Sequence, residues 1–379
     1  YLKMMYVKII YTQKCLLNKQ LTGINQKEVK LPKAIASIPH QLRVNAHRVD
    51  YIKAINEAID YPFQSEDGRD PSPFHIQLEN KCRQHTGIKN WQFTNCCTDS
   101  LQIAFHTLCA VGDTVIVPAY GWRAIVNAPC FVGMNVLFCD IDNTGNIDLQ
   151  QLEQMIIQHQ PKAVLIVHNF GAIVDFTEIV PTCKTYGVKI IEDAAPSFTI
   201  DEPYSYKLGS LSDIVCFSFD FTKSPGCLGA GGAIATNNDK IANKIKTICS
   251  HCSDGKFIGN KSYLDTTSAA VLVKDIELIE IHRYRAKRRA VANYYEKHLP
   301  FKTLAGKNFI YHRFIIFPED KQTALKLFKS KKILAKSVFA SNSINCKNAV
   351  QFSETAVELP CHHFIDIEDL KQRVESLNL

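Results

Sequence analysis

The chain has 379 residues, of which 46% are hydrophobic and 21% are charged, and its formal net charge is +7 at pH 7. This length exceeds what one hydrophobic core usually supports, so we expect a large domain with a smaller companion. The composition excludes intrinsic disorder, and the mild positive charge favours phosphorylated small molecules as partners over nucleic acid.

The N-terminal segment, residues 1–45, begins with an apolar stretch that does not predict a membrane anchor. Lys3, Lys8 and Lys14 interrupt this stretch well before it reaches a membrane-spanning length. We therefore expect an extension that packs on one of the domains, with neither a signal peptide nor a membrane partner. The 14 cysteines follow no spaced framework, which favours reduced thiols and a cytoplasmic protein.

The next part of the chain, up to about residue 236, alternates short apolar runs with helical patterns, as in a sheet covered by helices. Several runs are apolar on both faces, which is typical of a buried parallel sheet. The expected strands are 113–117, 135–140, 163–167, 188–192, 214–219 and 232–236, and a helix is expected at 100–110. The sequence therefore predicts an α/β fold with a mostly parallel sheet, in a large domain of residues 46–275.

The last part of the chain, residues 276–379, predicts a smaller C-terminal α+β domain. A long helical pattern, roughly residues 268–299, leads into it. A strand at 312–317 and helices near 321–329 and 367–377 follow. The last helix comes after Asp366, which is a favourable N-cap residue.

Charged residues lie at or just after the ends of two predicted strands of the large domain. A buried apolar strand ends in Glu192 and Asp193 in KIIEDAAPS, and Lys223 follows the next strand in CFSFDFTKSPG. Ligands bind at the carboxyl ends of parallel strands, so we expect at least one of the two carboxylates and the lysine at one edge of the sheet. An acid and a lysine so placed fit the chemistry of pyridoxal phosphate (PLP). The lysine bonds to the cofactor aldehyde, and the acid keeps the pyridine nitrogen protonated.

Further residues are candidates for binding the rest of this cofactor. Thr98 and Asp99 open a helix in CCTDSL, where backbone N–H groups can bind a phosphate, although either residue could simply cap the helix. Ser218 lies in the strand before the lysine and could add a hydroxyl. Trp122, in PAYGW, follows a predicted strand and could stack on the cofactor ring, with an ordinary core tryptophan as the alternative.

Five segments, in this order along the chain, resemble the DegT/StrS family of sugar aminotransferases, which are PLP enzymes with the type I aminotransferase fold. The segments are CTDSL, PAYGW, VHNFG, IEDAA and FSFDFTK. They resemble the family's phosphate-binding segment, ring-stacking segment, V-H-x-x-G, pyridine-binding strand end and F-S-F-x-x-x-K. The resemblance covers about residues 50–300. It implies that Asp193 binds the pyridine nitrogen, that Ser218 contacts the cofactor phosphate and that Lys223 carries the cofactor.

The same resemblance implies an activity and an assembly. The activity is transfer of an amino group, with glutamate as the expected donor, to a keto-sugar nucleotide, for amino sugars of a surface polysaccharide or glycan. The threonine-aspartate pair in CTDSL resembles the subgroup that aminates carbon 3. The assembly is a homodimer with shared active sites, because the family's N-Y-R segment contacts the phosphate of the neighbouring subunit. Here that segment is reduced to GNKSYL, so either Asn260 or Lys261 is the expected contact.

Two departures from the family pattern leave alternatives open. Pro196 stands where the family has Gln or His near the cofactor's phenolic oxygen, and Ala230 replaces the acid of G-E-G-G. One alternative is a homologue that has lost activity and serves in binding or regulation. The other is a PLP-dependent sugar dehydratase of the same fold. Those relatives replace the lysine with histidine, so Lys223 argues against it.

Two other patterns carry no functional prediction. Cys249 and Cys252 form a C-x-x-C with no second pair at zinc-site spacing, so no metal site is expected. The glycine-rich run at 226–232 precedes a strand and does not open a helix, unlike a dinucleotide-binding loop.

Overall fold

The structure is a computed structural model that describes residues 35, 40–59, 61, 71–198, 208–252, 255, 258–304 and 309–378. Most of the expected N-terminal extension, residues 1–45, lies outside this part of the chain. Within the described ranges, every helix is too short or too polar to cross a lipid bilayer.

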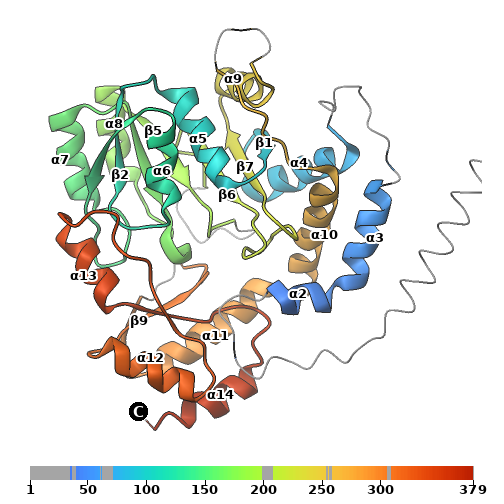
Figure 1. The fold of residues 1–379 in the computed structure, drawn as a ribbon, viewed down its shortest axis with the longest axis vertical. Helices are drawn as coiled ribbons and strands as arrows, with labels where there is room; N and C mark the ends of the chain where they lie inside the picture. The colour runs from blue at the N-terminus through green and yellow to red at the C-terminus, as the bar shows by residue number, and fades with distance from the viewer. Residues whose placement is uncertain are drawn as a thin grey trace, which may run out of the picture. The chain divides into compact units, whose positions relative to one another are not determined.

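The large sheet contains seven strands among the described residues, in the order β1-β7-β6-β5-β4-β2-β3 (Figure 1). They are β1 (Asn90–Thr94), β2 (Thr114–Pro118), β3 (Asn135–Cys139), β4 (Ala163–Val167), β5 (Lys189–Asp193), β6 (Ile214–Ser218) and β7 (Gly232–Thr236). Strands β2 to β6 pair in parallel, whereas β7 is antiparallel to both β6 and β1. The predicted α/β fold with a mostly parallel sheet is confirmed. The sequence predicts every strand except β1, each to within one residue of its observed ends.

Helices cover both faces of this sheet. On one face, α5 (Cys97–Leu108), α6 (Ala124–Phe131) and α9 (Asp239–Cys249) bury alternate strand residues such as Val115 and Leu165. On the other face, α7 (Leu149–His159) and α8 (Val180–Tyr186) bury the intervening residues, such as Ile116 and Val164. The strands therefore lie in the middle of three layers, which explains why their sequences are apolar on both faces.

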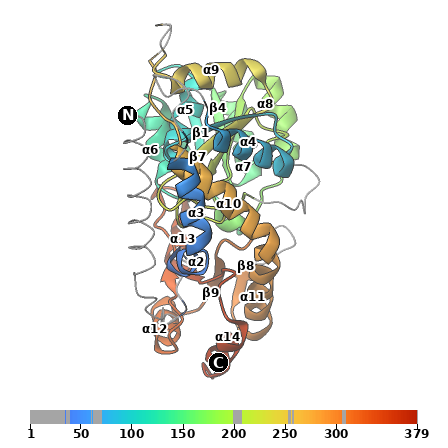
Figure 2. The same ribbon diagram turned by 90° about the vertical axis from the view of Figure 1, so that its right-hand side faces the viewer.

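Two further pairs of helices complete the large unit near β1, β6 and β7. Helices α4 (Pro73–Thr86) and α10 (Thr266–His282) pack on the strand residues Trp91 and Phe217. Helices α2 (His40–Ala46) and α3 (Arg48–Ile59) lie outside α10 (Figure 2). Tyr51 of α3 packs on Val271 of α10.

A smaller antiparallel sheet follows, with four strands among the described residues in the order β10-β11-β9-β8. The strands are β8 (Lys302–Leu304), β9 (Phe314–Phe317), β10 (Lys336–Ser337) and β11 (Val357–Leu359). The helices around it are α11 (Tyr284–His298), α12 (Lys321–Ser330), α13 (Lys347–Thr355) and α14 (Ile367–Glu375). Asp366 caps α14 as predicted, because its side chain accepts bonds from Glu368 and Asp369 N–H.

The helix predicted near 268–299 is two helices in the structure. Arg283 separates α10 from α11 and has a left-handed backbone, with φ of 50°. The core of the small sheet also includes Ala119, Tyr120 and Phe170, which follow β2 and β4. The small sheet therefore packs against loops at the carboxyl edge of the large sheet, where the candidate site lies.

Candidate active site

Asp193 is the last residue of β5, and its side chain is buried among polar groups of neighbouring elements. Its Oδ1 accepts a hydrogen bond from Ala195 N–H at 2.9 Å, and the Cys97 thiol of α5 lies 4.0 Å from the same oxygen. Burial raises the pKa of Asp193, while the Ala195 N–H and the charge of Lys223 act in the opposite direction. A cationic or proton-donating partner would therefore stabilise the carboxylate here.

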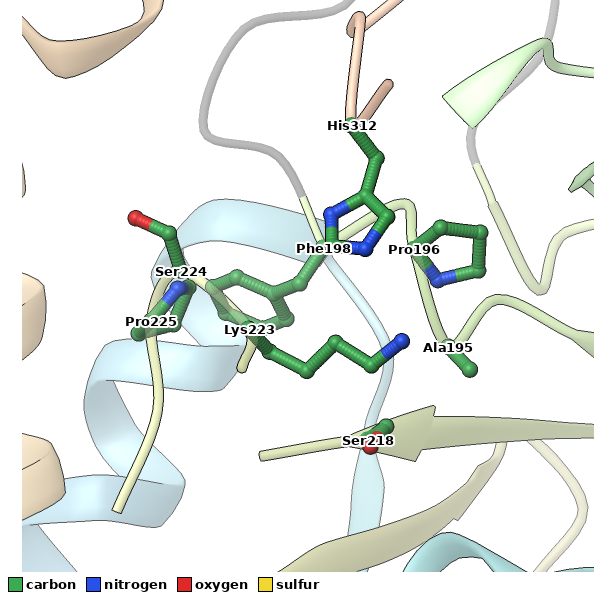
Figure 3. Close-up of a pocket in the computed structure, with 8 residues that line it drawn as sticks. All are labelled: Ala195, Pro196, Phe198, Ser218, Lys223, Ser224, Pro225 and His312. Atoms are coloured by element: carbon green, nitrogen blue, oxygen red, sulfur yellow. The ribbon is translucent and has the colours of Figure 1, made fainter. Parts of the chain in front are cut away.

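Lys223 follows β6, the strand that neighbours β5, and its half-buried side chain enters a small pocket. In Figure 3 this side chain extends between Ser218 and His312, with its amine toward Ala195. The pocket is lined by Ala195, Pro196, Phe198, Ser218, Lys223, Ser224, Pro225 and His312. Burial first, and then the charge of Arg313, lower the pKa of Lys223. Within the described ranges the amine has no hydrogen-bond partner, so it is available to react with a carbonyl group.

Gly232, the first residue of β7, allows helix α5 to lie close to these strands. A Cβ on Gly232 would lie 2.4 Å from the carbonyl carbon of Cys96, the N-cap of α5. Only glycine therefore allows the start of α5 to rest against β7. The neighbouring Gly231 faces its own loop, where a Cβ would lie 2.7 Å from the Cys227 sulfur. The close approach at Gly232 places the first turn of α5 beside Asp193.

The first turn of α5 contains two of the predicted cofactor contacts. Cys96 is the N-cap, and its sulfur accepts the Asp99 N–H at 3.5 Å, so neither Thr98 nor Asp99 caps the helix. The Asp99 carboxylate accepts bonds from Ser262 Oγ at 2.9 Å and Asn95 Nδ2 at 3.1 Å. The helix start can still bind an anion through its backbone N–H groups.

Trp122 and Asn260 lie apart from this pocket. The Trp122 side chain is 61% exposed and packs edge-on against Phe339. Asn260 is exposed, and its backbone N–H donates to Ile248 C=O at 2.7 Å. Neither residue lines the pocket, so their contacts with a cofactor remain predictions. The structure does bring together Asp193, Ser218 and Lys223.

The neighbouring acid, Glu192, faces the opposite side of the sheet and pairs with His168. Their side chains are fully buried, with His168 Nε2 3.1 Å from Glu192 Oε2. His168 Nδ1 accepts the Val174 N–H at 3.1 Å, so Nε2 carries the proton and donates to the glutamate. His168 is thus a hydrogen-bonded structural histidine, and Asp193 is the acid that faces the site.

His312 is a pocket residue that the sequence did not predict. It precedes β9 of the small sheet, and its backbone N–H donates to Phe170 C=O at 2.9 Å. Burial, followed by the charges of Arg313 and Lys223, lowers the pKa of His312 well below its usual range, so the imidazole is neutral. No local spacing in the sequence connects this histidine with Lys223, because the tertiary fold alone brings them together.

These residues fit the cofactor that the motifs imply. A lysine amine without a partner among the described residues suits an aldehyde, a buried carboxylate suits a protonated pyridine nitrogen, and a hydroxyl at the end of β6 suits a phosphate oxygen. All of them lie at the carboxyl ends of adjacent parallel strands, where ligands of open α/β sheets bind.

Known proteins similar to this chain include aminotransferases, in agreement with the motifs. The model of the DegT/DnrJ/EryC1/StrS aminotransferase family matches residues 50–378. The UDP-2-acetamido-2-deoxy-3-oxo-D-glucuronate aminotransferase of Pseudomonas aeruginosa is 36% identical over 215 residues, 55% of this chain and 59% of that protein. A UDP-4-amino-4,6-dideoxy-N-acetyl-beta-L-altrosamine transaminase of Campylobacter jejuni is 26% identical over 336 residues, 78% and 86% of the two chains. The match thus spans less than two thirds of the first relative.

A solved structure has the same fold. The structure of NtdA from Bacillus subtilis, described with bound cofactor PMP, superposes with a TM-score of 0.80 at 22% identity, over 93% of this chain and 86% of that chain.

Proposed function

The chain belongs to the DegT/DnrJ/EryC1/StrS aminotransferase family, and from that premise we propose that it is a PLP-dependent aminotransferase acting on a keto-sugar nucleotide. Glutamate is the proposed amino donor. One observation carries the proposal: Asp193 ends β5, and Lys223 lies in the loop that follows the adjacent parallel strand β6. The names of the two relatives support it, since both contain a UDP-linked sugar and an aminotransferase or transaminase activity.

Each site residue has a proposed role. When bound, PLP supplies an electron sink that stabilises the negative charge left when the donor's α-carbon loses its proton. Asp193 would hold the proton on the pyridine nitrogen, and Ser218 and the first turn of α5 would bind the phosphate. The lowered pKa of Lys223 leaves more of its amine neutral, so this amine can accept the proton from carbon and return it. His312 and Phe198 line the pocket around the amine (Figure 3), where they would limit the access of water.

The two domains have different roles in the proposed enzyme. The large domain, residues 46–275, would hold the cofactor, and the small domain, residues 276–379, would close the pocket with His312. We further propose a homodimer with shared active sites, in which Asn260 or Lys261 of the partner contacts the phosphate. The 13 cysteines that the structure describes are free thiols, which supports a cytoplasmic location.

A substrate panel tests the activity. Purified protein with PLP and glutamate carrying an isotopically labelled amino nitrogen is mixed with UDP- and dTDP-linked 3-keto and 4-keto sugars. Mass spectrometry should find the label in one sugar nucleotide. The 3-keto sugars are expected first, because of the threonine-aspartate pair in CTDSL and the 3-oxo sugar in the name of the first relative. A Lys223→Ala variant is the control. PLP bound at Lys223 without labelling of any sugar would favour a degenerate homologue.

A further inference from the structure

Arg43, on helix α2, binds the backbone of the loop that carries Lys223. This arginine is 1% exposed. Its Nη1 donates to Lys223 C=O at 2.8 Å, and its Nη2 donates to Phe221 C=O at 3.1 Å and to Cys227 C=O at 2.9 Å. One guanidinium therefore connects three carbonyl groups of the segment between β6 and β7.

Asp275, on α10, completes this buried network. Its Oδ2 lies 3.1 Å from Arg43 Nη1 and also accepts Gly226 N–H at 2.9 Å. Its Oδ1 accepts the hydroxyl of Tyr51, from α3. The aspartate thus binds both the arginine and the lysine loop, and it anchors them to the helices outside the large sheet.

Gly226 gives the arginine the space that it needs. A Cβ at this position would lie 2.8 Å from Arg43 Nη1, 2.8 Å from Lys223 C=O and 2.5 Å from Asp220 C=O. Because two of these atoms are backbone carbonyl oxygens, they cannot move aside as a flexible side chain could. A side chain at Gly226 would therefore displace either the guanidinium or the loop.

The guanidinium of Arg43 is better suited to holding the Lys223 loop in place than to stabilising the fold through its ion pair. A buried ion pair alone contributes little net stability, because desolvation of the two charges offsets their attraction. The guanidinium, in contrast, has several N–H donors in a rigid fork, which a lysine ammonium does not provide. Arg43 also lies before residue 50, where the match to the family model begins, so the arginine itself is outside the matched region.

We propose that Arg43 is a positioning residue for Lys223. It fixes the backbone from which the lysine side chain extends, and it thereby holds the amine in the pocket between Ser218 and His312. The catalytic role of Lys223 rests on the function proposed above, whereas the hydrogen bonds from Arg43 to its loop do not.

Two variants and a control distinguish positioning of the Lys223 loop by Arg43 from compensation of the Asp275 charge. Arg43→Lys keeps a positive charge for Asp275 but removes the fork. The double variant Arg43→Met with Asp275→Asn removes both charges, so no unpaired charge is buried. Arg48→Met, at an exposed arginine of the next helix, is the matched control.

The first measurement is amide hydrogen exchange of the protein without cofactor. In the structure Phe221, Lys223 and Cys227 N–H all donate to backbone carbonyls of the loop, so their exchange reports its order. Exchange at these three amides should become at least about tenfold faster in Arg43→Lys and in the double variant, which corresponds to a local loss of ~1.4 kcal/mol. Arg48→Met should match the parent protein.

The second measurement is the absorption of the PLP-loaded protein as a function of pH, with kcat and KM for the sugar nucleotide. Positioning predicts a shifted titration and a lower kcat with KM nearly unchanged in Arg43→Lys. Parent-like exchange and titration in both Arg43 variants would overturn the proposal. Faster exchange together with borohydride labelling of a different lysine would confirm that Arg43 holds the loop and refute the role given to Lys223.

Discussion

The Cys97 thiol lies 4.0 Å from the Asp193 carboxylate, so the first turn of α5 and the end of β5 meet at one point. Burial and the nearby carboxylate raise the pKa of Cys97 well above its usual range, so the thiol is protonated and can donate to Asp193. This meeting of the two elements supports the proposal that α5 binds the phosphate end of the cofactor and β5 its ring.

We expect Asp193→Asn to retain PLP but to lose transamination by about a hundredfold or more, on the scale of other positioned acid–base groups. The amide lacks the charge that keeps the pyridine nitrogen protonated, whereas the phosphate contacts are unchanged. Single-turnover kinetics with the amino donor measure the loss, and absorption measures the bound PLP. Turnover near that of the parent protein would show that another group holds the ring.

We expect Lys223 to be the residue that binds PLP covalently. Borohydride reduction of the loaded protein, followed by peptide mapping, should place the cofactor on the peptide that contains Lys223. The variant Lys223→Arg should bind PLP without becoming labelled, since the guanidinium does not attack an aldehyde at neutral pH. A label on any other lysine of the parent protein would contradict the assignment.

The pH dependence of PLP attachment should reflect the charge of Arg313. Because burial and Arg313 both lower the pKa of Lys223, the reactive neutral amine persists to lower pH than in an ordinary lysine. Removing the cation in Arg313→Gln should raise this pKa and shift the rate profile to higher pH. Stopped-flow absorption measures the shift, with Arg48→Gln as the control. An unchanged profile in Arg313→Gln would show that Arg313 does not influence the pKa of Lys223.

Much of the fold follows from the sequence, because buried parallel strands must be apolar on both faces. The short strand β1, with its buried Trp91 and Phe93 among polar residues, lacks that signal, so the sequence does not predict it. The sequence also does not predict the break at Arg283, since the apolar pattern runs through it and only the left-handed backbone ends α10.

The sequence predicts a site residue only where the same short segment also predicts the strand or helix that positions it. Asp193 ends a recognisable strand and Lys223 closely follows the next one, so their meeting follows from the topology. His312 and Arg43 reach the same loop from distant parts of the chain, and no periodicity or motif indicates such a contact.

Pro196 lines the pocket, where the family pattern places a hydrogen-bonding side chain. We expect Pro196→Gln to bind PLP more tightly, by up to about tenfold, because one added hydrogen bond contributes ~0.5–1.5 kcal/mol. Pro196→Ala is the control, since it removes the ring without adding a donor. Equilibrium titration of the absorption band measures both affinities. An equal change in the two variants would show that loss of the ring, and no new hydrogen bond, causes the effect.

We expect dimer formation and cofactor retention to be coupled. The hydroxyl and backbone donors of Thr98 and Ser218 supply no positive charge to a phosphate dianion, and Asp99 carries a negative charge next to them. A lysine from a second copy would offset this through a charge-assisted hydrogen bond, and symmetric dimers place such a residue in both sites at once. Lys261 has an exposed side chain and is one of the two candidates.

Dilution below the dimer dissociation constant should therefore release PLP, and Lys261→Ala should weaken PLP binding by about tenfold, on the scale of one charged hydrogen bond. Lys240→Ala, at another exposed lysine, is the matched control. Analytical ultracentrifugation with simultaneous detection of the cofactor absorption measures both quantities. A stable monomer with full PLP occupancy would refute the shared site, whereas a dimer indifferent to Lys261→Ala would leave Asn260 as the contact.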